Sequence, residues 1–200
     1  KPILYPVIGP YGIPMTRHYP MKKGVPGESG DHYHHQSIHY NHPVSGIDFW
    51  HGRGGARIRN DKIVKAEVVD GQALIVSRNS WMQGEKRILS DVTEIHAGTT
   101  QGGRFIDYKV SIHASEREIT FQDSKEGSMS IRTHPALRLN GKVAKGSAVN
   151  SEGVKGKAVW GKAAKWVNYW GPVDGKMVGI AIFDHPDNPR HPTTWHARDY

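Results

Sequence analysis

A turn between two strand-like segments restricts the possible folds of this chain more than any other feature. The dipeptide Asp70-Gly71 separates two segments rich in valine, isoleucine and alanine, residues 63–69 and 73–77. Asp-Gly favours the type I′ turn, whose twist matches that of the two strands it joins. The sequence therefore predicts a β-hairpin, with antiparallel strands on both sides of the turn.

Strand signals continue downstream of this hairpin. Residues 87–96 and 104–113 alternate apolar and polar side chains, which is typical of antiparallel strands with one buried face. Residues 119–121 and 128–132 predict a further pair, and the almost wholly apolar residues 177–183 predict a central strand buried on both faces. Because no convincing amphipathic helix accompanies them, the fold class is predicted to be all-β, an antiparallel β-sandwich.

Size and composition exclude several classes of protein. The 200 residues suit one domain over residues 1–200, and no apolar run approaches the roughly 20 residues that cross a bilayer. Cysteine is absent, so a metal would need histidine, carboxylate or carbonyl ligands. The net charge is +8, but the 27 lysines and arginines are scattered, which does not favour nucleic-acid binding. A soluble protein is predicted, of unknown oligomeric state.

Histidine is concentrated in two short segments, residues 31–35 and residues 184–198. Their histidines are His32, His34, His35, His185, His191 and His196. Imidazole is both the commonest metal ligand and the usual proton-transfer group near neutral pH. If residues 31–35 form a strand, His32 and His34 point to one side and His35 to the other. Two such segments far apart in the sequence predict one site that the fold assembles.

Three interpretations of the histidines remain open. His32, His34 and His185 would bind a divalent metal if a His-x-His pair is completed by a third ligand. Alternatively, the histidines transfer protons or hydrogen-bond a sugar. The catalytic candidates for this chemistry are His32, His34, His35, Glu126 and His185. The third interpretation is structural, with histidines hydrogen-bonding the backbone of a segment rich in proline and glycine.

Charged and aromatic residues outside these segments extend the candidate site. Glu126 follows Lys125 in a short segment between two apolar strands, where a carboxylate can act as a general acid or base. A solvated hairpin turn is the alternative for this segment. Trp160 and Trp195 have the flat apolar faces that stack on sugar rings. The predicted substrate-binding residues are Arg17, His18, Lys125, Asn150, Trp160, Lys162, Asp184, Asn188, Arg190, His191, Trp195 and His196.

Eight motifs stand in the order found in one bacterial family. They are residues 2–10, 15–20, 31–35, 46–50, 123–127, 150–153, 160–162 and 183–192. Through them the chain resembles the bacterial PmoA-like family, which is catalogued as "methane oxygenase", over nearly its whole length. The resemblance implies a β-sandwich of the galactose-mutarotase-like supersandwich type and a role in carbohydrate utilisation. It also implies a chain trimmed at both ends relative to family members.

The sequence and the resemblance together support three hypotheses of function. The first is a carbohydrate-active enzyme, a lyase, hydrolase or epimerase that uses acid/base chemistry on a glycoside or oxidised sugar. The second is a non-catalytic carbohydrate-binding module, and the third is a metal-dependent oxygenase with histidine and carboxylate ligands. A carbohydrate or glycoside is thus the expected ligand. A periplasmic or secreted location is expected. Because a chain without cysteine fits any redox compartment, a cytoplasmic location stays open.

Overall fold

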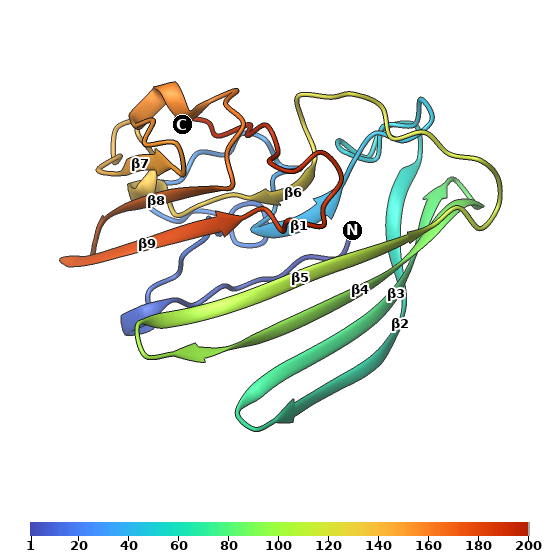
Figure 1. The fold of residues 1–200 in the computed structure, drawn as a ribbon, viewed down its shortest axis with the longest axis horizontal. Coiled ribbons are helices and arrows are strands. Elements are labelled where there is room, and N and C mark those ends of the chain that lie inside the picture. The colour runs from blue at the N-terminus through green and yellow to red at the C-terminus, as the bar shows by residue number, and fades with distance from the viewer. Residues whose placement is uncertain (200) are drawn as a thin grey trace. The chain divides into compact units, whose positions relative to one another are not determined.

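The computed structural model describes residues 1–199 as an almost wholly β-structured chain. The strands of this part form three open antiparallel sheets, of four, three and two strands (Figure 1). No sheet in residues 1–199 closes into a barrel. These sheets confirm the predicted all-β, antiparallel β-sandwich fold class, whereas the galactose-mutarotase-like type stays a prediction. In this part of the chain, no helix is both long enough and apolar enough to cross a bilayer.

The chain divides into two compact units. Unit 1 consists of Lys1–Leu4 and Ile38–Ser130, and unit 2 consists of Tyr5–Ser37 and the residues from Ile131 onward. The chain passes between the units three times, so neither is one continuous segment. The prediction of a single domain over residues 1–200 stays a prediction.

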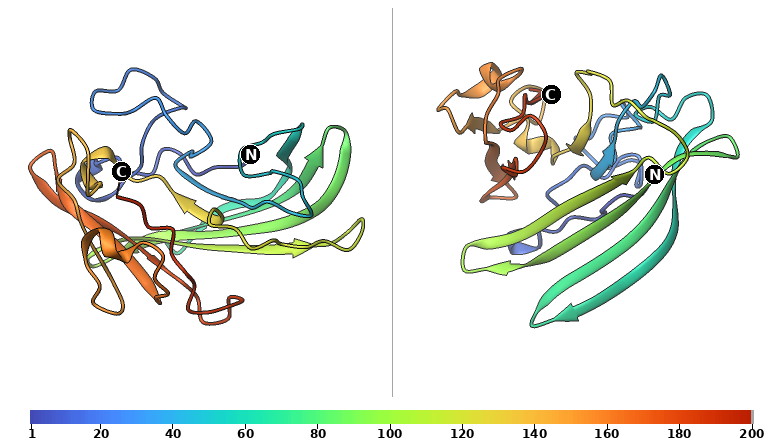
Figure 2. Two further views of the ribbon diagram at one scale, coloured as in Figure 1. Left: turned by 90° about the horizontal axis from the view of Figure 1, so that it is seen from above. Right: turned by 45° about the vertical axis from the view of Figure 1, so that its right-hand side comes forward.

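The largest sheet belongs to unit 1 and is a meander of four strands in chain order (Figures 1 and 2). Its strands are β2 (Ala56–Val69), β3 (Gln72–Gln83), β4 (Lys86–Thr100) and β5 (Gly103–His113). The hairpin at Asp70-Gly71 is confirmed, with φ of 51° and 75° at the two turn residues, as a type I′ turn requires. The predicted strands at 87–96 and 104–113 are confirmed within β4 and β5.

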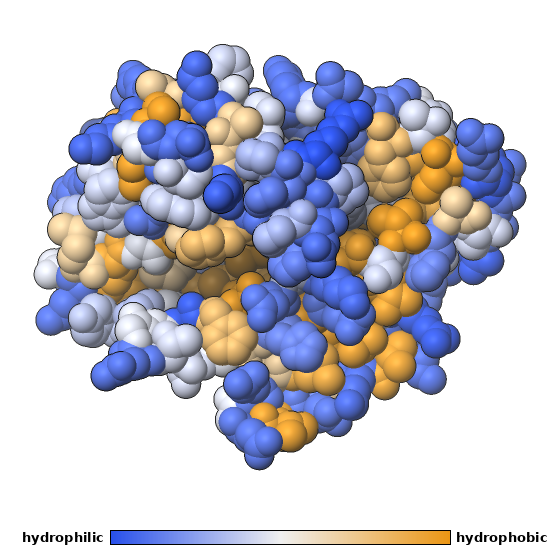
Figure 3. Space-filling model, in the orientation of Figure 1, coloured by the Kyte–Doolittle hydropathy of each residue, from blue (hydrophilic) through white to orange (hydrophobic). Residues whose placement is uncertain are grey.

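The far end of this sheet carries little of the core. Beyond Ile58, every residue of β2 is exposed, including Val68 at 73% and Val69 at 54%. Figure 3 shows a small hydrophobic patch among hydrophilic residues at the tip of the β2–β3 hairpin. The core of unit 1 therefore lies under the opposite end of the sheet, close to the start of β2.

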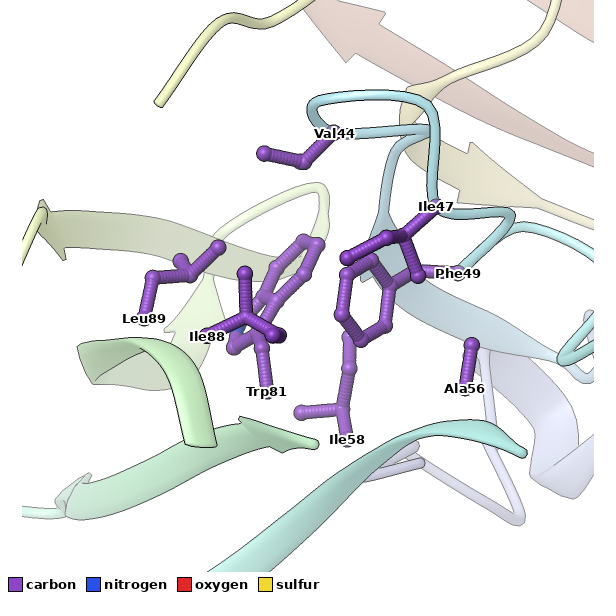
Figure 4. Close-up of a cluster of buried hydrophobic side chains, with 8 residues drawn as sticks. All are labelled: Val44, Ile47, Phe49, Ala56, Ile58, Trp81, Ile88 and Leu89. Atoms are coloured by element: carbon purple, nitrogen blue, oxygen red, sulfur yellow. The ribbon is translucent and has the colours of Figure 1, made fainter. Parts of the chain in front are cut away.

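That core is a cluster of apolar side chains around Trp81, which is completely buried (Figure 4). It consists of Val44, Ile47, Phe49, Ala56, Ile58, Trp81, Ile88 and Leu89. The Trp81 indole N–H donates to the buried Asp91 carboxylate at 2.7 Å, and Asn79 and Thr93 donate to the same carboxylate. Buried polar groups need hydrogen-bond partners, and these three donors supply them to the Asp91 carboxylate inside an apolar core. Figure 4 shows that Val44, Ile47 and Phe49 from the segment 44–49 contribute side chains to this core.

A second sheet of two strands pairs β1 (Ile38–Asn41) with β6 (Ser128–Ile131). The prediction that residues 119–121 pair with residues 128–132 is therefore wrong. Phe121 instead forms an isolated bridge with Val44. The error has a physical cause. The partner of β6 is β1, which is distant in the sequence, so the alternation of residues near β6 does not indicate the pairing.

Unit 2 contains the third sheet and three short 3-10 helices, η1 (Pro10–Gly12), η2 (Pro135–Leu137) and η3 (Gly156–Val159). The sheet is formed by β7 (Ser147–Asn150), β8 (Trp166–Val173) and β9 (Lys176–Phe183). The predicted central strand at 177–183 is wrong, because β9 is an edge strand with Met177 65% and Phe183 71% exposed. Only alternate residues of β9, such as Val178, face the unit 2 core.

Candidate functional site

The first histidine segment forms a turn in unit 2. The His35 N–H donates to the His32 carbonyl at 2.9 Å, and His32 has a left-handed φ of 46°. The prediction of a strand with His35 pointing away is therefore wrong. The ring centroids of His32 and His35 lie 5.0 Å apart, and those of His34 and His35 lie 4.3 Å apart. The turn thus brings the His35 imidazole against those of His32 and His34, from which a strand would separate it.

Arg17 is the residue that fixes this turn. Its side chain is 2% exposed, and its guanidinium donates to the Asp31 carboxylate at 2.8 Å. It also donates to the carbonyls of His32 and His35, at 3.0 and 3.3 Å. The predicted role of Arg17 was to bind substrate oxygens. In the structure its guanidinium donates to its own chain instead, which makes Arg17 a positioning residue of the histidine turn.

The Asp31 carboxylate is the acidic partner in this arrangement. Partial burial by itself raises the pKa of Asp31, but hydrogen bonds from Ser29, His32 and Arg17 and the charge of Arg132 outweigh it. The pKa of Asp31 consequently lies well below its usual range. Asp31 is therefore ionised at neutral pH and holds the buried Arg17 cation and the start of the histidine turn together.

The predicted metal site gains no support from the described side chains. In residues 1–199, no group of three or more histidine, cysteine, aspartate or glutamate side chains is placed to hold a metal ion. Of the predicted ligands, His32 and His34 lie in the turn. His185 lies in a loop after β9, with its side chain 70% exposed and its Nδ1 accepting from the Asp187 N–H.

The second histidine segment is organised by Asp184, whose side chain is 5% exposed. Its carboxylate accepts from the Asn188 amide at 2.8 Å and from the Thr193 N–H at 2.9 Å, and lies 2.7 Å from Nδ1 of His191. Three predicted substrate-binding residues therefore form the internal framework of one loop. Arg190, in the same loop, is exposed. A cleft shared between this loop and the histidine turn stays a prediction.

Three more predicted ligand residues contact their own chain. Asn150 is buried, and its side-chain oxygen accepts from the N–H groups of Glu152 and Val154. Nδ1 of His18 lies 2.8 Å from the Tyr5 hydroxyl. Trp195 donates its indole N–H to the Ala164 carbonyl at 2.7 Å. Asn150 and Trp195 thus bond to the backbone of their own chain, whereas His18 contacts the Tyr5 side chain. Lys162, by contrast, is exposed.

Trp160 differs from these residues, because half of its side-chain surface is exposed. It follows η3 and borders a hollow of about 280 Å³ in unit 2. The hollow is lined by Lys157, Trp160, Ala197, Arg198 and Asp199. The Arg198 guanidinium lies 5.7 Å from the centre of the indole, and the indole N–H donates to His196 at 3.4 Å. Lys157 pairs with Asp199 at 3.4 Å, so the hollow combines one aromatic face with charges of both signs.

Glu126 and Lys125 belong to unit 1, whereas the other predicted site residues belong to unit 2. In unit 1, Oε2 of Glu126 lies 3.8 Å from Nε2 of His51, and Nδ1 of His51 lies 2.9 Å from Oδ2 of Asp48. Partial burial by itself raises the pKa of Asp48. The hydrogen bonds from His51 and the positive charges of His51 and Arg53 outweigh this effect, so the pKa of Asp48 lies below its usual value.

Sequence reasoning missed His51, although it directly follows the motif at residues 46–50. Its only local signal is an aspartate three residues earlier, Asp48, which suits a turn in which the carboxylate reaches back to the imidazole. The contact with Glu126 has no local signal, because the two residues lie far apart in the sequence.

Fold and site together define an all-β protein with antiparallel sheets, whose candidate polar sites lie separately in its two units. Over residues 1–200 the chain matches the model of a family of unknown function, DUF6807, and it belongs to that family. Neither a curated protein nor a solved structure matched the chain. The PmoA-like resemblance stays a prediction.

Proposed function

We propose that the protein is a carbohydrate-active enzyme and that the Trp160 hollow of unit 2 holds a ring of its glycoside substrate. One observation carries the proposal. Trp160 is a large aromatic residue with half its surface exposed, at the edge of a hollow that is also lined by cationic and anionic side chains. Other large apolar residues of the chain are exposed as well, and Trp160 differs from them because it borders a hollow that has charged side chains in its lining.

The composition of the hollow suits a sugar. An indole face packs against the C–H groups of a pyranose ring, and the charged side chains of Arg198, Lys157 and Asp199 hydrogen-bond its hydroxyls. The volume of about 280 Å³ lies near the lower end of ligand pockets, about 300–1,000 Å³, which fits one ring rather than a long chain. Two cations beside one carboxylate also suit an oxidised sugar that carries a carboxylate.

Binding of defined saccharides to the full chain tests this proposal. Titrations with glucose, glucuronate and their disaccharides are followed by tryptophan fluorescence and by calorimetry. Trp160→Ala is expected to weaken binding at least about tenfold, a loss of roughly 1.4 kcal/mol. The matched control is Phe183→Ala, which removes another exposed aromatic side chain of unit 2 and should leave affinity unchanged.

The same titrations separate the enzyme from the alternatives. Release of a new reducing end or of an unsaturated product from a bound saccharide favours the enzyme. Binding through Trp160 without turnover of any saccharide in the set favours the non-catalytic module. If no saccharide binds at millimolar concentration, or if Trp160→Ala binds as tightly as the parent, the proposal is wrong.

A further inference from the structure

We propose that Asp48, His51 and Glu126 of unit 1 form a proton-transfer site that takes a hydroxyl group of a polyol between Nε2 of His51 and Oε2 of Glu126. The inference goes beyond the proposed function, because it assigns a second, separate site that shares with it only the class of ligand. Its geometry is independent of the Trp160 hollow, since all three residues belong to unit 1.

Asp48 fixes the orientation of the His51 ring. The His51 backbone N–H donates to Oδ1 of Asp48 at 2.9 Å, and Nδ1 lies 3.1 and 2.9 Å from the two carboxylate oxygens. A carboxylate with a lowered pKa only accepts hydrogen bonds, so the proton of this contact sits on Nδ1. The other ring nitrogen, Nε2, is consequently the one that exchanges a proton with a ligand.

The gap between His51 and Glu126 has the size for a bridging oxygen. At 3.8 Å, Nε2 and Oε2 are too far apart for a direct hydrogen bond. A separation of this kind between two polar groups is typical of a bridge through a water or a hydroxyl. With His51 protonated, Nε2 donates to the hydroxyl oxygen and the hydroxyl donates to Glu126. His51 then acts as the acid and Glu126 as the base on the hydroxyl oxygen of the ligand.

Access and charge agree with this role. The side chains of Asp48, His51 and Glu126 are 30%, 27% and 24% exposed, so a ligand reaches them from solvent while the protein still screens them in part. The Lys125 ammonium lies 3.9 Å from the other oxygen of Glu126. Lys125 thus places a positive charge beside the carboxylate that accepts the hydrogen bond from the hydroxyl.

Two consecutive residues at the end of β1 hold both sides of the pair in place. The buried Asn41 donates its side-chain amide to the carbonyls of Phe49 and Trp50, both at 3.0 Å, which fixes the segment that carries His51. His42 donates through Nε2 to the Gln122 carbonyl at 2.8 Å, which fixes the segment that leads to Glu126. Acid and base are thus attached to one strand, which limits changes in their separation.

Nuclear magnetic resonance of the full chain with ¹⁵N-labelled histidine tests the site, with glucose and xylitol as probes. The His51 ring signals are expected to shift in a saturable way with either polyol. Glu126→Gln keeps the shape of the side chain but removes its charge, and should raise the apparent Kd at least about fivefold, because the bond to an ionised acceptor is lost. Glu118→Gln is the control, since Glu118 is an exposed glutamate of the same unit.

The outcomes are separable from those of the proposed function. Polyol-induced shifts at His51 that persist in Trp160→Ala support the site in unit 1. Glucose binding that depends on Trp160 but leaves the His51 signals unchanged overturns this inference and leaves the proposed function standing. A shift that is equally strong in Glu126→Gln, with the amide signals of His96 in β4 and His113 in β5 unaltered, also overturns it, because the bridge requires the carboxylate.

Discussion

The histidine turn of unit 2 and the single histidine His51 of unit 1 hold imidazoles in different ways. In the turn, three rings contact one another, and the buried cation Arg17 fixes the backbone around them. At His51, one carboxylate orients the ring and a second faces its other nitrogen. The comparison teaches that clustering in the sequence does not by itself produce acid/base geometry. The partners of the two ring nitrogens decide it.

The largest expected effect concerns the cation that builds the turn. Arg17→Ala should lower the free energy of unfolding by about 3 kcal/mol, because it removes the bonds of a buried guanidinium to the carbonyls of His32 and His35 and to the Asp31 carboxylate. Urea denaturation measures the change. The control Arg53→Ala, at an arginine whose side chain is 74% exposed, should stay within about 0.5 kcal/mol. A cost below about 1 kcal/mol for Arg17→Ala would mean that the turn does not depend on this cation.

The next largest effect is the pH dependence of the stability that Asp31 contributes to the histidine turn. Asp31 has a folded pKa below its unfolded value of about 3.9, so its contribution is fully present above pH ~4 and is lost as pH falls through the folded pKa. Because the side chain is 42% exposed, solvent screening limits the contribution to about 1 kcal/mol. Asp31→Asn should therefore be less stable than the parent at pH 6, and the difference should shrink toward pH 2. Urea midpoints across this range check it, and a difference independent of pH would contradict it.

The turn also shows how far the sequence could be interpreted. The Asp70-Gly71 hairpin was predictable because its turn chemistry is contained in two adjacent residues. The histidines at 32–35 were recognised as a group, but their conformation depends on Arg17, an earlier residue that becomes buried only in the fold. The local pattern of apolar residues in β9 likewise did not indicate that the strand lies at a sheet edge.

The same argument explains the candidate sites. A sugar-stacking role for Trp160 was predicted from its residue type and stays a prediction, whereas its exposure depends on the folded loop around it. Glu126 was recognised by its charge between two strands. Its neighbour His51 was not, since their contact depends on how β1 positions two segments that are far apart in the chain. Local chemistry was predictable, and pairings across the chain were not.

A smaller effect should separate the two histidine environments. Asp48→Asn replaces a carboxylate, which only accepts hydrogen bonds, with an amide that can also donate to Nδ1 of His51, so the neutral ring should shift toward the Nε2-protonated form. The free energy of unfolding should change by less than about 1 kcal/mol, because Asp48 is partly exposed. ¹⁵N chemical shifts measure the tautomer, and the signals of His32, His34 and His35 serve as the internal reference. An unchanged His51 tautomer would show that Asp48 does not orient the ring.

The smallest effect on stability is expected at His185, which the sequence placed in the catalytic set with the turn. Its side chain is 70% exposed and its ring accepts only a local N–H in the described structure, so His185→Ala should change the free energy of unfolding by no more than about 0.5 kcal/mol. This neutrality makes the variant a clean test of the shared cleft. If turnover of a saccharide falls in His185→Ala while stability and the His51 signals stay unchanged, the loop after β9 takes part in catalysis. If turnover is unaffected, His185 takes no part in catalysis, and its loop serves as the framework around Asp184.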